Sequence, residues 1–281
     1  MRVSSLLISA ISCLGFFSVP TTQALAWGAL GHKVVAIIAE DHLSPEAGQA
    51  VSALLSSEGK VNLDEVASWA DRMRALAIPK QPSHMVSIPL DHSAYDPEVS
   101  CARSNCVLGA LKAGLDTLRN PEAPVEAKAI ALNYVVHYVG DIHEPLHTSV
   151  DAGFEGVEYG PKRQSLHRIW DNSIILDQEK SARSIAEDIE RHPSHAYVGG
   201  SPENWAVEGR DIARDEIFPE LDKWRVNGVV TLPDNYADEK WPIVRQRLEQ
   251  GGLRLAALLN GIFVPSPQAS DRGDVVDGPT P

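Results

Sequence analysis

The stretch VEAKAIALNYVVHYVGDIHEPLH, residues 125–147, decides the fold of this chain. It is the longest and most apolar segment in which apolar residues recur at helical spacing, which predicts a buried helix. His137 and Asp141 lie four residues apart, so both side chains point to one side of that helix. Pro145 should bend or end the helix before His147. The segment therefore predicts a core helix that carries a histidine and a carboxylate on one face.

The rest of the sequence extends this helical pattern in both directions. No segment shows the apolar–polar alternation of strands joined by hairpin turns. Residues 80–104 and 148–166 are rich in Pro, Gly and Ser, which is typical of loops. We expect one all-α domain over residues 27–264 and a disordered tail with little apolar content over 265–281. The predicted helices are 32–43, 63–76, 125–147, 181–190 and 241–263.

The first 26 residues have the features of a secretory signal peptide. Arg2 is their only charge, an apolar stretch runs from Leu6 to Val19, and the run ALA at 24–26 fits the small-x-small cleavage pattern. A membrane anchor is the alternative, but the apolar stretch is shorter than the ~20 residues that a span requires. We therefore expect a secreted or periplasmic protein whose mature chain begins at Trp27.

Charge and cysteine content narrow the function classes further. The net charge of −13 at pH 7 excludes a broad basic face for holding nucleic acid, so an anionic substrate would need positive charge concentrated in its site. Cys101 and Cys106 are the two cysteines beyond the signal peptide. An even pair in an exported chain favours a small-loop disulfide, with zinc ligation as the weaker alternative.

Histidine and aspartate recur at metal-ligand spacing in apolar surroundings. His167 and Asp171, in LHRIWD (166–171), repeat the four-residue spacing of His137 and Asp141. A single pair of this kind is usually a salt bridge or lies on the surface. Two pairs in apolar sequence indicate chelation of a cation, because buried ionisable groups are costly unless they are paired or bind metal. The further candidates are His147, which follows the first pair, and His32, Asp71 and His84, which precede it.

The order of these motifs resembles the S1/P1 nuclease family. The chain has W-G-x-x-G-H from Trp27, W-A-D from Trp69, a loop histidine at position 84, H-x3-D-x-H-x-P-L-H from His137, and L-H-x-x-W-D from Leu166. The resemblance covers nearly the whole mature chain, from Trp27 to at least Asp171. It implies an exported α-helical phosphodiesterase with three zinc ions, of a fold related to bacterial zinc phospholipases C.

The resemblance also implies a set of ligands for three Zn²⁺ ions. Signal cleavage would itself create one of them, because the free amine of Trp27 can bind a metal ion together with its carbonyl oxygen. Asp141 would bridge two of the ions. The implied first site is Asp71, His84, His137 and Asp141, the second is His147, His167 and Asp171, and the third is Trp27, His32 and Asp141.

Residues for catalysis and substrate binding follow from the same resemblance. Arg74, one turn after Asp71, resembles the basic residue that stabilises the charged transition state, so Arg74 and Asp71 are the expected catalytic residues. The family often has an acidic residue at the position of Ser87. It usually has the loop sequence D-x-G-G-N where residues 151–155 of this chain read DAGFE, so that Glu155 replaces the asparagine. Ser87 and Glu155 are the expected substrate contacts. These departures remove no metal ligand but lie where a base would be recognised.

The implied function is hydrolysis of single-stranded DNA and RNA to 5′-phosphate products by a metal-bound hydroxide. A zinc phospholipase C acting on phosphodiester lipids is the first alternative. A non-catalytic exported zinc-binding protein is the alternative of another class. We expect a monomer with no transmembrane segment and no stable protein partner, which binds single-stranded nucleic acid as its substrate.

Overall fold

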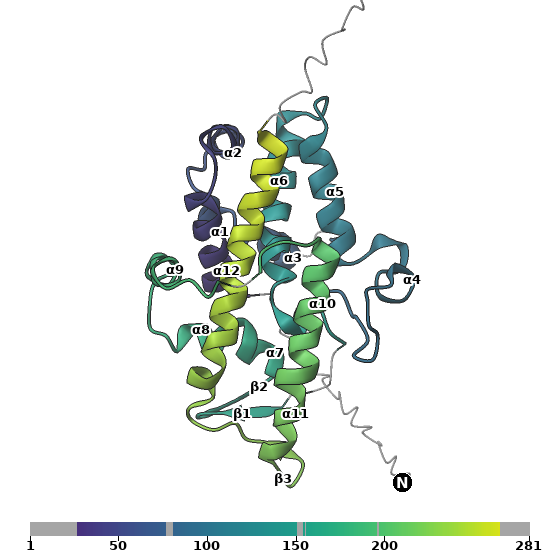
Figure 1. Ribbon diagram of the computed structural model, residues 1–281, viewed down its shortest axis with the longest axis vertical. Helices are drawn as coiled ribbons and strands as arrows, with labels where there is room; N and C mark the ends of the chain where they lie inside the picture. The colour runs from purple at the N-terminus through teal and green to yellow at the C-terminus, as the bar shows by residue number, and fades with distance from the viewer. Residues whose placement is uncertain (1–26, 77–80, 151–153, 155, 196, 265–281) are drawn as a thin grey trace, which may run out of the picture.

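The computed structural model describes residues 27–76, 81–150, 154, 156–195 and 197–264. The predicted signal peptide (1–26) and the predicted tail (265–281) lie outside the described residues. The described chain is one helical domain with two small two-stranded sheets (Figure 1). The prediction of an all-α fold is therefore confirmed.

Helix α6 (Val125–Asp141) lies in the centre of the molecule, where α5 (Val107–Arg119) and α12 (Tyr236–Phe263) pack against it (Figure 1). Between residues 131 and 141 all its side chains except that of Tyr134 are buried, as expected for a helix without a polar face. The helix ends at Asp141, and Pro145–His147 forms a separate 3-10 turn. The predicted break before His147 is confirmed.

The first and last helices of the described chain pack against each other. Helix α1 (Ala29–Asp41) lies along α12. A Cβ atom at Gly252 would lie 2.5 Å from Cβ of Ile38, and one at Gly251 would lie 3.2 Å from Cγ2 of Val35. Side chains at these two positions of α12 would push the helices apart. The glycine pair therefore permits the close approach that fixes α1 against the core.

The remaining helices surround this core. Helix α2 packs on α6 and α12, α9 packs on α1, and α10 packs on the 3-10 turn that follows α6. Helices α2, α9 and α10 each begin after a serine whose hydroxyl accepts a hydrogen bond from the first turn. The bounds are α2 Pro45–Ser57, α3 Trp69–Ala75, α4 Pro97–Ser100, α7 Leu166–Arg168, α8 Ile174–Leu176, α9 Ala182–Arg191, α10 Pro202–Ile212 and α11 Phe218–Leu221.

The structure corrects several of the predicted helices. The segment 63–76 is divided into a 3-10 turn, Leu63–Glu65, and α3. The last helix begins at Tyr236 rather than at 241, although Pro242 lies inside it. Helices α2, α5 and α10 are absent from the prediction, and each contains glycine. Glycine lowers helix propensity, and here tertiary packing outweighs that cost.

Two short β-hairpins add to the predicted helical fold, although no segment of the sequence shows the alternation of strands. Strand β1 (Val157–Tyr159) pairs antiparallel with β2 (Lys162–Gln164), within the span predicted to be a loop. Strand β3 (Arg225–Val226) pairs antiparallel with β4 (Val229–Val230). Strands of two or three residues are too short to show alternation in a sequence. Turn residues Gly160 and Gly228 have positive φ, of 53° and 84°.

Two buried arginines of α12 hold the end of α6 in place. Arg247 donates hydrogen bonds to the carbonyl oxygens of Ile142 and His143 and to the carboxylate of Glu208 on α10. Arg254 donates to the same carboxylate and to Nε2 of His143. Ile142 and His143 directly follow the last residue of α6, so this network fixes the point where the helix ends.

The predicted disulfide is confirmed, since Cys101 and Cys106 are bonded in the loop before α5. This pairing excludes the alternative that the two cysteines bind zinc. Within the ranges that the structure describes, none of the helices combines the length and the apolar character needed to cross a membrane.

Candidate metal centre

The centre of the site is the C-terminal end of α6. His137 and Asp141 are both fully buried, and Nε2 of His137 lies 3.4 Å from Oδ2 of Asp141. A carboxylate at the last residue of a helix adjoins the negative end of the helix dipole, which disfavours its charge. A buried carboxylate in this position therefore needs strong positive charge nearby.

Side chains from three other segments surround Asp141. Its Oδ1 lies 3.3 Å from Nε2 of His32 on α1, and its Oδ2 lies 3.3 Å from Nδ1 of His84 in the loop after residue 80. Asp71 of α3 completes the group, with Oδ1 3.4 Å from Nδ1 of His84 and 3.6 Å from Nε2 of His137. Ligand atoms that share one zinc ion stand roughly 3.3 Å apart, so these separations fit a common cation. We call these five residues, His32, Asp71, His84, His137 and Asp141, the Asp141 cluster.

Backbone carbonyls determine which nitrogen of two histidines faces the site. Nδ1 of His137 donates to the carbonyl oxygen of Ala67, at 2.7 Å, and Nδ1 of His147 donates to that of His84, at 2.9 Å. In the neutral rings Nε2 is then unprotonated, and its lone pair can bind a cation, which in His137 would replace the present contact with Nδ1 of His84 at 3.0 Å. Such an outer hydrogen bond from the second ring nitrogen is typical of histidines that ligate metal.

A glycine lets His32 reach the cluster. A Cβ atom at Gly140 would lie 2.5 Å from Nδ1 of His32, which would displace the imidazole. With glycine in this position the ring of His32 stacks on that of His137, with centroids 3.9 Å apart. The residue before Asp141 therefore controls how closely α1 approaches α6.

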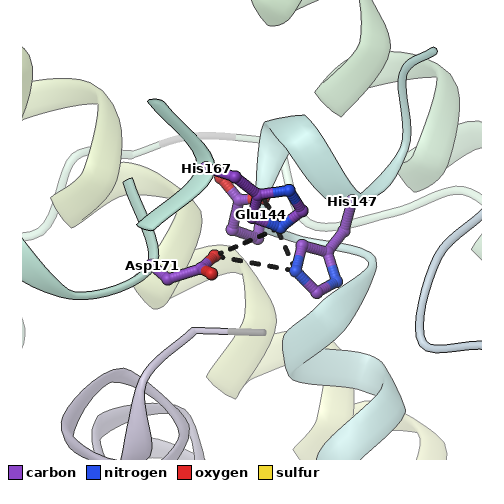
Figure 2. A group of neighbouring side chains, drawn as sticks. All are labelled: Glu144, His147, His167 and Asp171. Atoms are coloured by element: carbon purple, nitrogen blue, oxygen red, sulfur yellow. Dashed lines mark ion pairs between the residues drawn. The ribbon is translucent and has the colours of Figure 1, made fainter. Parts of the chain in front are cut away.

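A second group of ligand-type side chains adjoins the first. Figure 2 shows Glu144, His147, His167 and Asp171 converging on a common point, and we call these four residues the Asp171 cluster. Oδ1 of Asp171 lies 3.6 Å from Nε2 of each histidine. Nδ1 of His147 also lies 3.9 Å from Oδ1 of Asp141. The two clusters are therefore neighbours.

The predicted pair His167 and Asp171 comes together on an irregular helix. His167 belongs to α7, and Asp171 lies in the π-helical turn Ile169–Ser173 that follows it. Single π-turns within helical segments occur frequently at functional sites. The sequence spacing predicts the pair, but the structure places it on a π-turn rather than on one face of a regular α-helix.

Trp27 is fully buried and is held beside the Asp171 cluster. The amide of Gly28 donates to the carbonyl oxygen of Asp171, at 2.7 Å. A Cβ atom at Gly28 would lie 1.8 Å from Oδ1 of Asn172. Glycine directly after the tryptophan therefore allows the backbone of Trp27 to lie close to residue 171.

The other predicted site residues differ in their burial, and one of them lies outside the described residues. Arg74 is half-buried on α3, one turn after Asp71, and makes no hydrogen bond or ion pair with any residue that the structure describes. Ser87 is exposed, three residues after His84. Glu155 lies outside the described residues. His143, which the sequence does not predict as a ligand, contacts Arg254 of α12 through Nε2.

Many buried polar atoms of the two clusters have no hydrogen-bond partner within the described part of the chain. Leaving such an atom unsatisfied costs about 1–3 kcal/mol, and more where the group is charged. Imidazole nitrogen and carboxylate oxygen are donors that zinc accepts. The residues present therefore fit bound metal ions. The unpartnered atoms include Nε2 of His32, His147 and His167 and both carboxylate oxygens of Asp141, Glu144 and Asp171.

Burial keeps two of the histidines neutral at pH 7. It lowers the pKa of His32 to about 4, and the neighbouring His137 adds to the shift. It lowers the pKa of His167 to about 3, with contributions from the charges of His147 and Arg74. Both rings are therefore ready to bind a cation without first losing a proton.

Two other groups hold protons at pH 7 when no metal is bound, and the pKa of a third is raised. Burial lowers the pKa of His137, but the charges of Asp141 and Asp71 outweigh this and raise it to about 9. Burial and the charge of Asp171 raise the pKa of Glu144 to about 8, which the amides near its carboxylate offset only in part. Burial also raises the pKa of Asp171 well above its ordinary value, and the charge of Asp141 adds to the shift.

Glu144 is the member of the clusters that the sequence analysis lacks. Its carboxylate is fully buried, with Oε2 3.9 Å from Nε2 of His147 and 4.0 Å from Nε2 of His167. The sequence feature that could have identified Glu144 is its position three residues before His147, because residues at this spacing share one side of a helix. Pro145 obscured that signal, because a helix should not continue through it. Only the 3-10 turn brings both side chains to the same side.

The fold and the two buried clusters define a helical protein able to bind metal ions, and comparison with known proteins gives its family. A sequence model of the S1/P1 nuclease family matches residues 27–264. The chain is 31% identical to Endonuclease 2 of Arabidopsis thaliana, over 84% of this chain and 90% of that protein. It is 26% identical to Nuclease P1 of Penicillium citrinum, over 84% and 97%, and 25% identical to Nuclease S1 of Aspergillus oryzae, over 83% and 91%. The chain belongs to the S1/P1 nuclease family.

We predict that metal binding releases protons. Without metal, the pKa of His137 is about 9 and that of Glu144 about 8, so each holds a proton at pH 7 that the charge of a bound cation would displace. Loading with Zn²⁺ at pH 7 should release about two protons per chain, and the affinity should fall as the pH is lowered from about 8 to 6. Titration calorimetry in two buffers of different ionisation enthalpy measures the number released. Equal binding enthalpies in both buffers would contradict the prediction.

Proposed function

We propose that this chain is a zinc-dependent nuclease that hydrolyses single-stranded DNA and RNA and leaves 5′-phosphate ends. The observation that carries the proposal is the pair of adjoining buried clusters, whose unpartnered imidazole nitrogens and carboxylate oxygens match the ligand preferences of zinc. Membership of the S1/P1 nuclease family supports the same reaction, as do the names of the relatives, which are nucleases and endonucleases.

The proposal includes three zinc ions per chain. The Asp141 cluster has more ligand groups than one ion needs, and Asp141 presents one oxygen to His32 and the other to His84 and His137. This arrangement supports a bridging role for Asp141 between two ions. The proposed ligands are Asp71, His84, His137 and Asp141 for the first ion, His147, His167 and Asp171 for the second, and Trp27, His32 and Asp141 for the third.

The protein residues around the ions would position and stabilise the reacting phosphate. When bound, the zinc ions would polarise the phosphate oxygens and make a water molecule acidic enough to act as the nucleophile. Arg74 is a cation without an ion-pair partner in the described chain, one turn after Asp71. We propose that its guanidinium donates hydrogen bonds to the phosphate as negative charge grows on the oxygens.

The proposed substrate preference follows from the recessed site and from its few base contacts. A single strand can bend its backbone into a buried cluster, whereas a duplex must first unpair. Ser87 is exposed but has no charge with which to accept paired hydrogen bonds from a base edge. Glu155 would add negative charge near an anionic substrate. We therefore propose weak base preference and modest affinity.

Export completes the proposal. Residues 1–26 are proposed as a signal peptide, 27–264 as the nuclease domain and 265–281 as a disordered tail of a monomeric, secreted or periplasmic enzyme. Export would deliver the chain to the oxidising surroundings that suit the Cys101–Cys106 disulfide. Removal of residues 1–26 would also give Trp27 its free amine.

We predict faster cleavage of single-stranded than of double-stranded oligonucleotides of the same sequence. The products should carry 5′-phosphates and show little sequence bias. Adding a chelator should stop their formation. A time course on DNA and RNA, beside a phosphatidylcholine hydrolysis assay, makes the measurement. Hydrolysis of the lipid without cleavage of either nucleic acid would replace the nuclease proposal with a phospholipase C.

We predict that Arg74→Ala lowers turnover by roughly 100-fold or more, the effect of removing a donor that acts on the transition state. Zinc content and melting temperature should stay close to those of the wild type, because Arg74 pairs with no other described residue. Arg72→Ala is the matched control, since Arg72 is exposed on the same helix. Equal turnover in the two variants would remove Arg74 from the catalytic residues.

We predict that one additional residue before Trp27 weakens the site. Extension converts the amine of Trp27 into an amide, which is a poor zinc ligand, so zinc content should fall by up to one ion and activity should fall with it. An extended chain with a protease site that restores Trp27 as the first residue is the control. Full zinc content in the uncleaved chain would show that the amine is not a ligand.

A further inference from the structure

The Asp171 cluster contains one carboxylate more than the proposed zinc sites use. Glu144 is fully buried between the end of α6 and α7, and neither of its carboxylate oxygens makes a hydrogen bond of ordinary geometry with the described residues. Burying a carboxylate without partners is costly, and a second buried carboxylate, that of Asp171, belongs to the same group. The position therefore calls for a cation.

The geometry of Glu144 is that of a ligand rather than of an outer neighbour. Its Oε2 lies 3.9 Å from Nε2 of His147 and 4.0 Å from Nε2 of His167, while Oδ1 of Asp171 lies 3.6 Å from each of the same two atoms (Figure 2). One ligand atom from each of the four side chains lies within 4.8 Å of all the others. A tetrahedral zinc ion sets its ligand atoms roughly 3.3 Å apart. The four separations of 3.6 to 4.0 Å exceed this value by about 0.3 to 0.7 Å, and no pair within the group exceeds it by more than about 1.5 Å, so a small inward movement of the side chains would bring all four atoms into reach of one ion.

We propose that Glu144 is a fourth protein ligand of the zinc ion held by His147, His167 and Asp171. This inference rests on the proposed function, because it takes zinc as the ion of this site. The centre would have two neutral imidazoles and two carboxylates, which offset the ion's charge. Four protein ligands also fill a tetrahedral zinc shell, as in sites that hold their ion firmly. Glu144 therefore strengthens the hold of the Asp171 cluster on its ion.

The first test compares zinc retention in Glu144→Gln and Glu144→Met with the wild type. Each protein is loaded with Zn²⁺, dialysed against a series of EDTA concentrations, and analysed for bound zinc. One equivalent should leave Glu144→Gln at an EDTA concentration at least about 10-fold lower than in the wild type, and still lower in Glu144→Met, which has no ligand oxygen. Curves that coincide for all three proteins would overturn the proposal.

The second measurement separates ligation from a purely structural role. Melting temperatures are taken with zinc and after its removal. Without zinc, Glu144→Gln should melt at or above the wild-type temperature, because the variant removes a buried carboxylate that faces Asp171. With zinc the order should reverse, because the wild type gains more from the ion. An equal loss of stability in both states would make Glu144 a structural residue and overturn the proposal.

Glu249→Gln is the matched control, since Glu249 is also a buried carboxylate but accepts its hydrogen bond from the amide of Ser194, at 2.9 Å. Its zinc retention should equal that of the wild type.

Failure of the nuclease proposal and failure of the fourth-ligand proposal can be told apart. A wild type that binds zinc and cuts no nucleic acid refutes the nuclease but leaves the Glu144 comparison valid. A wild type that cuts single strands while Glu144→Gln retains zinc normally refutes only the fourth ligand.

Discussion

The buried carboxylate of Asp141 is the constraint on which the rest of the structure depends. It stands at the C-terminal end of the central helix, where the helix dipole opposes its charge, and it is fully buried. Imidazoles from α1, from the loop after residue 80 and from α6 itself lie within 3.3 to 3.4 Å of its two oxygens. Segments that are distant in the sequence are therefore brought together at one point. The packing of the helices holds these polar groups close together in the interior of the domain.

That packing is achieved by close approach and by hydrogen bonds to backbone groups. Gly140 lets His32 lie against α6, and Gly251 and Gly252 let α12 lie against α1. Arg247 binds the carbonyl oxygens that follow the end of α6. Because many of the ligand-type atoms have no hydrogen-bond partner among the described residues, the arrangement is costly without cations, and we expect folding and metal binding to be coupled. The proposed catalytic site and the folding core are thus the same part of the molecule.

Positive charge confined to the site explains how an acidic protein could act on a polyanion. The chain has a net charge of −13, so its surface repels nucleic acid. The proposed ions and Arg74 would confine the positive potential to the buried clusters. Within that site, the additional carboxylate of Glu144 would give the ion of the Asp171 cluster a fourth protein ligand, the number that the proposed first ion has from Asp71, His84, His137 and Asp141.

The sequence by itself determined the helical fold class, the disulfide and the identity of nearly all the side chains that form the two clusters. Pairs such as His137–Asp141 could be recognised because spacing along one helix fixes which residues share a face. Their assignment to individual ions stays a prediction. Only the tertiary structure decided that Glu144 joins His147, that His167 and Asp171 lie across a π-turn, and that helices form at α2, α5 and α10. These features depend on contacts between segments far apart in the chain, which local periodicity does not record.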